Sequence, residues 1–237
     1  MSSTEVIREN VDLAVADGSR MPAYVARPAR EEQHPVLLLF QEAFGVNHHI
    51  RSVGDRFAAE GYVVIAPELF HRTAPPGFEA SYTDFPSVMP HLKAVTTETA
   101  EADTRSAYDW LRSNALVKPG EISSVGFCMG GRVSFIANSV VPLRAAVSFY
   151  GGGIAPGLLD LAAKLHGQSL FVWGGMDKHI TPEHRRAVTE ALSGEHKPYV
   201  SVEFSRAEHG FFCDERAAYE PHSARQAWAL TLEFLRS

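Results

Sequence analysis

Apolar and polar positions follow two different periods along this chain, and each period predicts a different kind of element. Residues 10–27 alternate singly around the turn sequence Ala16-Asp17-Gly18-Ser19, which is typical of an antiparallel β-hairpin. Beyond the hairpin, short apolar runs predict buried strands at residues 36–40, 62–66, 121–125, 145–150, 169–173 and 199–204. Between these runs, helical periodicity predicts helices at residues 46–60, 96–113, 132–138, 183–192 and 223–236. Strands that alternate with helices indicate an α/β fold: a mostly parallel, twisted sheet with helices on both faces.

One segment does not follow this alternation of strands and helices. Residues 67–90 are rich in proline, glycine and aromatic side chains, and they are too long for an ordinary connection between two elements. Loops of this length in compact domains are usually functional, and the aromatic residues argue against disorder. We therefore predict a lid-like loop over about residues 68–93.

Composition narrows the class of protein. A chain of 237 residues with 45% hydrophobic content is sufficient for one core, so we predict a single domain over residues 1–237. The net charge of −6, without a basic cluster, argues against a nucleic-acid partner. The N-terminus does not resemble a signal peptide, and no apolar run is long enough to span a bilayer. With only two cysteines and no export signal, we expect reduced thiols and a cytoplasmic location.

The most informative motif is the hexapeptide Gly126-Phe127-Cys128-Met129-Gly130-Gly131, which lies between a predicted strand and a predicted helix. A nucleophile on such a tight turn needs small neighbours, as in the G-x-S-x-G elbow of α/β-hydrolases, here with sulfur in place of oxygen. The turn also aims the Met129 amide and the positive end of the helix at the same point, which favours a thiolate and an oxyanion. Alone, the motif is weak evidence, because small residues and buried cysteines are common.

Three further residues strengthen this interpretation by their positions. Glu42, Asp177 and His209 each follow a predicted strand, as Cys128 does, and ligands of a parallel sheet bind beyond the carboxyl ends of its strands. The chain order of nucleophile, acid and histidine is that of the α/β-hydrolases. Taken singly, Asp177 could cap a turn and His209 could be a solvated loop residue. Together, the four residues predict nucleophilic catalysis, with His209 as the base and Asp177 orienting it.

The chain resembles the dienelactone hydrolase family, the carboxymethylenebutenolidases, over nearly its whole length. The resemblance is carried by Gln41-Glu42-Ala43-Phe44-Gly45-Val46-Asn47, Pro67-Glu68-Leu69-Phe70-His71-Arg72, the hexapeptide around Cys128, Trp173-Gly174-Gly175-Met176-Asp177 and His209-Gly210-Phe211-Phe212. It implies an α/β-hydrolase fold, a Cys128–His209–Asp177 triad, and hydrolysis of a small unsaturated lactone through a thioester. It also implies an oxyanion hole formed by the amides of Met129 and Ala43.

Glu42 is expected to modulate the nucleophile. A carboxylate facing the thiol in a dry pocket would keep it as neutral S–H by accepting its hydrogen bond and disfavouring a second negative charge. The resemblance implies that substrate binding displaces Glu42 and frees the thiolate. The alternative is that Glu42 is a solvated loop residue or a helix cap.

The resemblance also assigns substrate contacts. Arg72 matches an arginine that binds the substrate carboxylate in this family, a task that suits a fork-shaped cation. The family's second arginine falls four residues after the histidine, where this chain has Cys213. Half of the anion clamp is therefore missing, and the sequence does not show whether Arg216 replaces it. Tyr150 and Phe44 are expected to line the pocket, although both also suit packing at strand ends.

No metal-binding spacing occurs among the histidines, so we predict neither a metal nor a cofactor. The expected partner is a small lactone or ester, with no nucleic acid or membrane partner, and the protein is expected to be a monomer or a weak homodimer. One alternative is a general carboxylesterase or thioesterase on the same scaffold. A more remote one is a small-molecule-binding module with an inactive triad.

Overall fold

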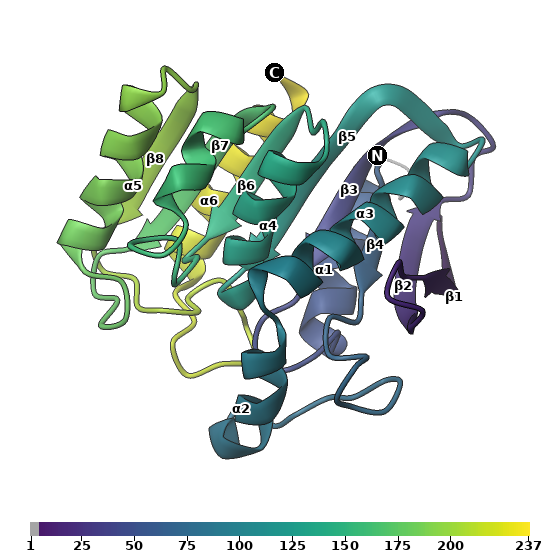
Figure 1. Cartoon of the computed structure of the whole chain (residues 1–237), viewed down its shortest axis with the longest axis horizontal. Coiled ribbons are helices and arrows are strands. Elements are labelled where there is room, and N and C mark those ends of the chain that lie inside the picture. The colour runs from purple at the N-terminus through teal and green to yellow at the C-terminus, as the bar shows by residue number, and fades with distance from the viewer. Residues whose placement is uncertain (1–4) are drawn as a thin grey trace.

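A computed structural model describes residues 5–237 and shows one eight-stranded sheet in the order β1-β2-β4-β3-β5-β6-β7-β8 (Figure 1). β1 pairs antiparallel with β2 and β2 antiparallel with β4, whereas the other neighbours are parallel. The predicted mostly parallel sheet with an N-terminal antiparallel hairpin is confirmed. The strands are β1 Val6–Ala14, β2 Arg20–Pro28, β3 His34–Phe40, β4 Val63–Pro67, β5 Val117–Phe127, β6 Ala145–Phe149, β7 Gln168–Gly174 and β8 Tyr199–Phe204.

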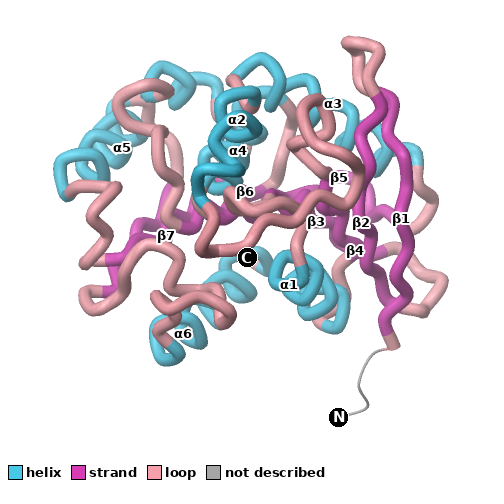
Figure 2. The backbone as a smooth tube through the Cα atoms, turned by 90° about the horizontal axis from the view of Figure 1, so that it is seen from below, coloured by secondary structure: helices cyan, strands magenta, loops and turns pink. Residues whose placement is uncertain are grey.

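Helices cover both faces of the sheet. Figure 2 shows α3, α4 and α5 on one side of the strands and α1 and α6 on the other. The α-helices are α1 His48–Ala59, α2 Phe85–Ala94, α3 Thr97–Ser113, α4 Met129–Val140, α5 Pro182–Gly194 and α6 Pro221–Arg236, and a short 3₁₀ helix spans Leu159–Lys164.

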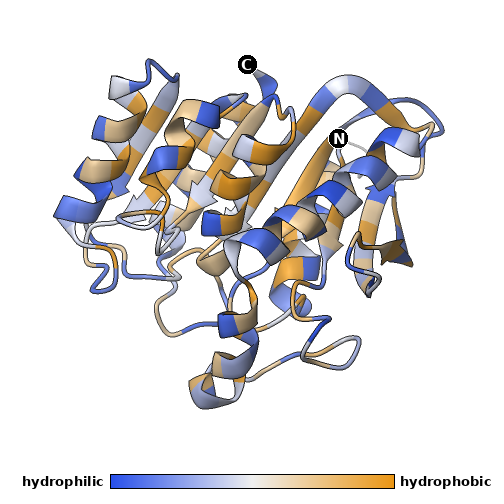
Figure 3. Cartoon of the chain, viewed as in Figure 1, coloured by the Kyte–Doolittle hydropathy of each residue, from blue (hydrophilic) through white to orange (hydrophobic). Residues whose placement is uncertain are grey.

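The core lies between these layers, and burial explains the apolar runs in the sequence. In β3, Val36 to Phe40 are fully buried, because a central parallel strand is covered on both of its faces. Figure 3 shows the central strands as largely hydrophobic and the outer faces of the helices as largely hydrophilic. Across residues 5–237, no helix has the length and apolar character needed to cross a membrane.

The lid-like segment contains a helix that the sequence pattern did not predict. α2 lies within it, and prolines at 86 and 90 obscured its helical pattern. Pro86 is tolerated because it falls in the first turn, where backbone amides have no intrahelical acceptor. The Asp84 side chain caps the helix by accepting a hydrogen bond from the Ser87 amide at 3.4 Å.

α2 rests on a small apolar cluster that is separate from the main core. Val88 is its one buried residue, and it packs with Ala43 and Phe44 in the loop that follows β3. Partly buried side chains surround this cluster, namely Phe78, Ala80, Tyr82 and Leu92. The lid-like segment is therefore anchored on the loop that also carries Glu42.

Candidate active site

Cys128 lies at the junction between β5 and α4, as the hexapeptide predicts. Its φ of 55° and ψ of −115° place a non-glycine residue in strained backbone, which is common where a functional side chain must be held in one direction. The residue is half-buried. The sharp turn thus presents the thiol at the carboxyl end of the sheet.

The glycines of the hexapeptide are required by close backbone approach. A Cβ on Gly130 would overlap the carbonyl oxygen of Phe40 and lie 2.5 Å from that of Gln41. A Cβ on Gly131 would lie 2.7 Å from the carbonyl oxygen of Phe149. The start of α4 therefore packs directly against the ends of β3 and β6, which no larger residue would permit.

The three residues of the expected triad meet in one hydrogen-bonded series. His209, in the loop after β8, places its Nε2 3.1 Å from the Cys128 sulfur. Its Nδ1 lies 2.7 Å from an oxygen of Asp177, which is in the loop after β7. The other oxygen of Asp177 accepts hydrogen bonds from the amides of His179 at 2.8 Å and Ile180 at 3.2 Å, which fix the carboxylate.

The charges of this series reinforce one another. Burial works against a charged imidazole, but the facing Cys128 thiolate and Asp177 carboxylate outweigh it and raise the pKa of His209 to about 10. Burial would also raise the pKa of Asp177, but the hydrogen bond from His209 and those from the two amides lower it below its usual value. The arrangement therefore favours the protonated form of His209.

The expected oxyanion donors lie on adjacent segments. Met129 is the first residue of α4, and the first amides of a helix have no intrahelical acceptor. Ala43 follows β3 and is buried. The close approach of Gly130 to Phe40 and Gln41 brings the segment after Cys128 against the end of β3, just before Ala43.

Glu42 is buried at this site but has a different partner from the one expected. Its Oε1 accepts a hydrogen bond from Arg216 at 3.2 Å, whereas the hydrogen-bond partner of the thiol is His209. Glu42 is 1% exposed, and within residues 5–237 its Oε2 has no hydrogen-bond partner. The direction of Arg216, which the sequence left open, is thus toward Glu42 and the aromatic rings of Phe44 and Tyr82.

Tyr150 and Phe44 both lie beside these groups. The Tyr150 ring is fully buried with its centroid 5.1 Å from that of His209, and burial raises the pKa of its hydroxyl well above the usual value. Among the described residues, this hydroxyl has no hydrogen-bond partner, so it is a free polar group at the site. Phe44 packs on Tyr82 with ring centroids 4.8 Å apart.

Arg72 is the one predicted site residue that the structure does not bring to this cluster. Two of its nitrogens donate to the carboxylate of Asp103, at 2.9 and 2.8 Å, and a third donates to Asp17 at 2.7 Å. Asp103 is fully buried on α3 and also contacts His71 at 3.2 Å. Arg72 therefore ties the start of the lid-like segment to α3 and to the turn between β1 and β2.

A cleft of about 460 Å³ opens over His209. Sequence reasoning did not assign several of its residues, because long side chains on loops carry no periodic signal. The cleft is lined by Tyr82, Thr83, Met176, Lys178, His179, Glu208, His209, Glu215, Arg216, Ala217 and Ala218. Its wall combines polar and apolar surface in similar amounts and includes both basic and acidic groups, which suits a small ligand with polar and apolar parts.

Comparison with known proteins identifies the family of the chain. The sequence model of the dienelactone hydrolase family matches residues 21–237. A relative from Synechocystis sp., provisionally named carboxymethylenebutenolidase, is 34% identical over 96% of this chain and 94% of its own length. A carboxymethylenebutenolidase from Pseudomonas sp. is 28% identical over 98% of this chain and 96% of its own length.

A solved structure gives the same picture. The crystal structure of a provisionally named dienelactone hydrolase from Klebsiella pneumoniae superposes with a TM-score of 0.89 at 29% identity, and the match covers 98% of this chain and 99% of that one. The family model and the relatives thus agree with the observed fold. The chain is a hydrolase that belongs to the dienelactone hydrolase family.

Proposed function

We propose that this enzyme hydrolyses small lactones or activated esters through a thioester formed on Cys128. The observation that carries the proposal is the unbroken contact from the Cys128 sulfur through His209 to the anchored Asp177. A binding module has no need for a nucleophile, a base and an orienting acid in this order. The family match and the size of the cleft support a small substrate.

In the first half of the reaction, the Cys128 thiolate attacks the substrate carbonyl carbon. The carbonyl oxygen becomes an oxyanion, to which the amides of Met129 and Ala43 donate hydrogen bonds. Collapse of this intermediate breaks the carbon–oxygen bond of the ester, and the leaving oxygen takes the proton from Nε2 of His209. A lactone ring opens in this step, so the whole substrate stays attached as the thioester.

In the second half, His209 acts as a base. Its neutral Nε2 takes a proton from water, and the hydroxide formed attacks the thioester carbon. The carbon–sulfur bond breaks, the thiolate returns, and the product leaves as a carboxylic acid. Asp177 holds the ring orientation throughout, because its carboxylate is itself fixed by two amides.

Mass spectrometry after a brief pulse with a panel of lactones and esters tests this reaction. We expect the peptide that contains Cys128 to gain the full mass of a lactone, or the acyl mass of an ester. Cys128→Ala should show no such adduct. An adduct on another residue, or turnover without any adduct and without dependence on Cys128, would contradict the proposal.

We further propose that Arg216 binds a carboxylate group of the substrate. It would take the role of the family's second arginine, whose position is occupied by Cys213 in this chain. Arg216 lines the cleft and already holds one carboxylate, that of Glu42. A substrate carboxylate would replace Glu42 as the hydrogen-bond acceptor of Arg216. Charge-assisted hydrogen bonds of this kind contribute about 1.5–3 kcal/mol to binding. The carboxylesterase alternative is a neutral ester, whose turnover would not need this cation.

The two arginines should therefore respond differently to substitution. In Arg216→Met, we expect kcat/KM for a carboxylate-bearing lactone to fall about 10- to 100-fold relative to kcat/KM for a neutral ester of the same size. In Arg72→Met, we expect a lower Tm and an unchanged ratio, because Arg72 serves Asp103 and Asp17. A ratio that follows Arg72 and ignores Arg216 would refute this assignment.

A further inference from the structure

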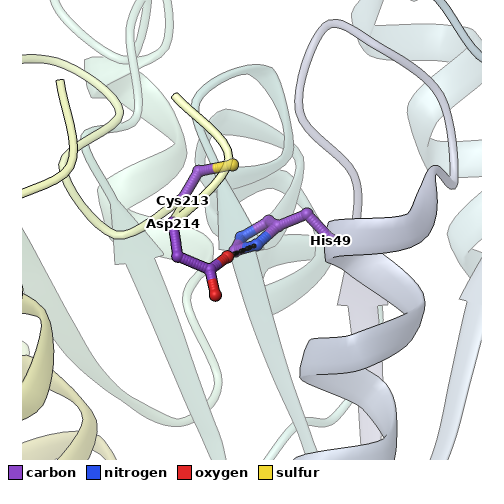
Figure 4. A group of neighbouring side chains, drawn as sticks. All are labelled: His49, Cys213 and Asp214. Atoms are coloured by element: carbon purple, nitrogen blue, oxygen red, sulfur yellow. Dashed lines mark hydrogen bonds and ion pairs between the residues drawn. The ribbon is translucent and has the colours of Figure 1, made fainter. Parts of the chain in front are cut away.

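Outside the catalytic series, three metal-ligating side chains converge from segments far apart in the sequence. His49 comes from α1, and Cys213 and Asp214 come from the loop between β8 and α6 (Figure 4). One donor atom from each residue lies within 4.8 Å of the other two. Nδ1 of His49 is 3.2 Å from Oδ1 of Asp214.

The cluster is mostly buried, it has an unpartnered nitrogen atom, and it can be reached from solvent on one side. His49 is 2% exposed and Cys213 is fully buried, and the imidazole lies against the rings of Phe127 and Phe212. Within the described part of the chain, Nε2 of His49 has no hydrogen-bond partner, which is rare for a buried ring nitrogen. The Asp214 side chain is 66% exposed, so the cluster can be reached from solvent.

We propose that His49, Cys213 and Asp214 form a site for a divalent transition metal such as Zn²⁺, separate from the catalytic centre. Imidazole, thiolate and carboxylate are the ligands that Zn²⁺ prefers, and three protein ligands leave the fourth position for water. Bond lengths of about 2.0–2.3 Å require the three side chains to move slightly inward from their present spacing. The prediction that no metal binds considered local spacing in the sequence, which cannot show a site whose ligands lie so far apart.

Metal binding would change one contact at the wall of the cleft. The Cys213 thiol donates a hydrogen bond to the Tyr82 hydroxyl, 3.2 Å away. On binding, a sulfur–metal bond replaces the sulfur–hydrogen bond, and the proton leaves to solvent. Tyr82 then loses this donor but keeps the one from Asn47, 2.8 Å away.

Cobalt is the probe for this site, because Co²⁺ bound to a thiolate gives a charge-transfer absorption band in the near ultraviolet. In an oxygen-free titration of the full-length protein, we expect the band to saturate at one equivalent of Co²⁺ and to disappear when Zn²⁺ is added. The band should persist in Cys128→Ser and be absent in Cys213→Ser. No band in the wild type, or a band that depends on Cys128 and not on Cys213, overturns the proposal.

A variant at an exposed position separates loss of metal binding from misfolding, which a substitution of the buried Cys213 could cause. Asp214 is exposed, so Asp214→Asn should fold normally and weaken Co²⁺ binding at least about 10-fold. His48→Asn is the matched control, because His48 neighbours His49 but its exposed ring faces Glu215 instead. We expect His48→Asn to bind Co²⁺ as the wild type does. Wild-type affinity in Asp214→Asn overturns the three-ligand site.

Discussion

Replacing Cys128 with alanine should lower kcat/KM for every ester and lactone substrate by a factor on the order of 10⁴ or more. The expected loss is large because the proposed reaction passes through a covalent intermediate on this sulfur, and removal of a nucleophile leaves only binding and oxyanion stabilisation. The Cys128 sulfur is the atom that lies 3.1 Å from Nε2 of His209, and alanine has no nucleophilic atom to put in its place. Steady-state kinetics with a chromogenic ester and with a lactone measure the effect.

The control for this variant is its fold. Alanine is smaller than cysteine and Cys128 is only half-buried, so we expect a circular dichroism spectrum and Tm close to those of the wild type. Cys128→Ser tests the requirement for sulfur, since a hydroxyl at this position is far less acidic than a thiol. Unchanged turnover in a folded Cys128→Ala protein would end the proposal of covalent catalysis.

Replacing Gly130 with alanine should destabilise the protein by about 3–5 kcal/mol, which is a large share of the stability of a typical domain. The added methyl group would meet the backbone carbonyls of Phe40 and Gln41, which cannot rotate away as a side chain would. α4 or the end of β3 must then shift, and both carry groups of the catalytic site. The midpoint of urea unfolding measures the loss.

Gly152→Ala is the matched control, because nothing lies within 4 Å of a Cβ at that position. We expect its unfolding midpoint to differ from that of the wild type by less than the equivalent of about 1 kcal/mol. If both variants unfolded at the same urea concentration, the close packing of α4 against β3 would not be what requires glycine at position 130.

Most of the fold and the catalytic series followed from the sequence because both depend on periodic or local signals. Apolar runs marked the buried strands, and the positions just after them marked where Cys128, Asp177 and His209 would meet. Parallel strands bring their carboxyl ends to one edge, so topology alone assembled residues that lie far apart in the chain. α2 was missed because its prolines, which disfavour helix interiors, interrupt its pattern.

The directions of long side chains could not be predicted in the same way. Arg72 was expected at the substrate, but the buried carboxylate of Asp103 on α3 engages two of its nitrogens. Arg216 was left without a direction, and it faces Glu42 across two loops. The partner of each arginine depends on which carboxylate is buried without another cation nearby. That arrangement is known only once distant segments have been packed together.

The small cluster beneath α2 also separates the stability of the lid-like segment from that of the sheet. Because Val88 is the one buried residue of α2, the free energy needed to open this segment locally is well below that of global unfolding. Amide hydrogens of α2 will therefore exchange with solvent long before those of β3. Local opening of α2 would let ligand enter and product leave while the strands of the sheet stay folded.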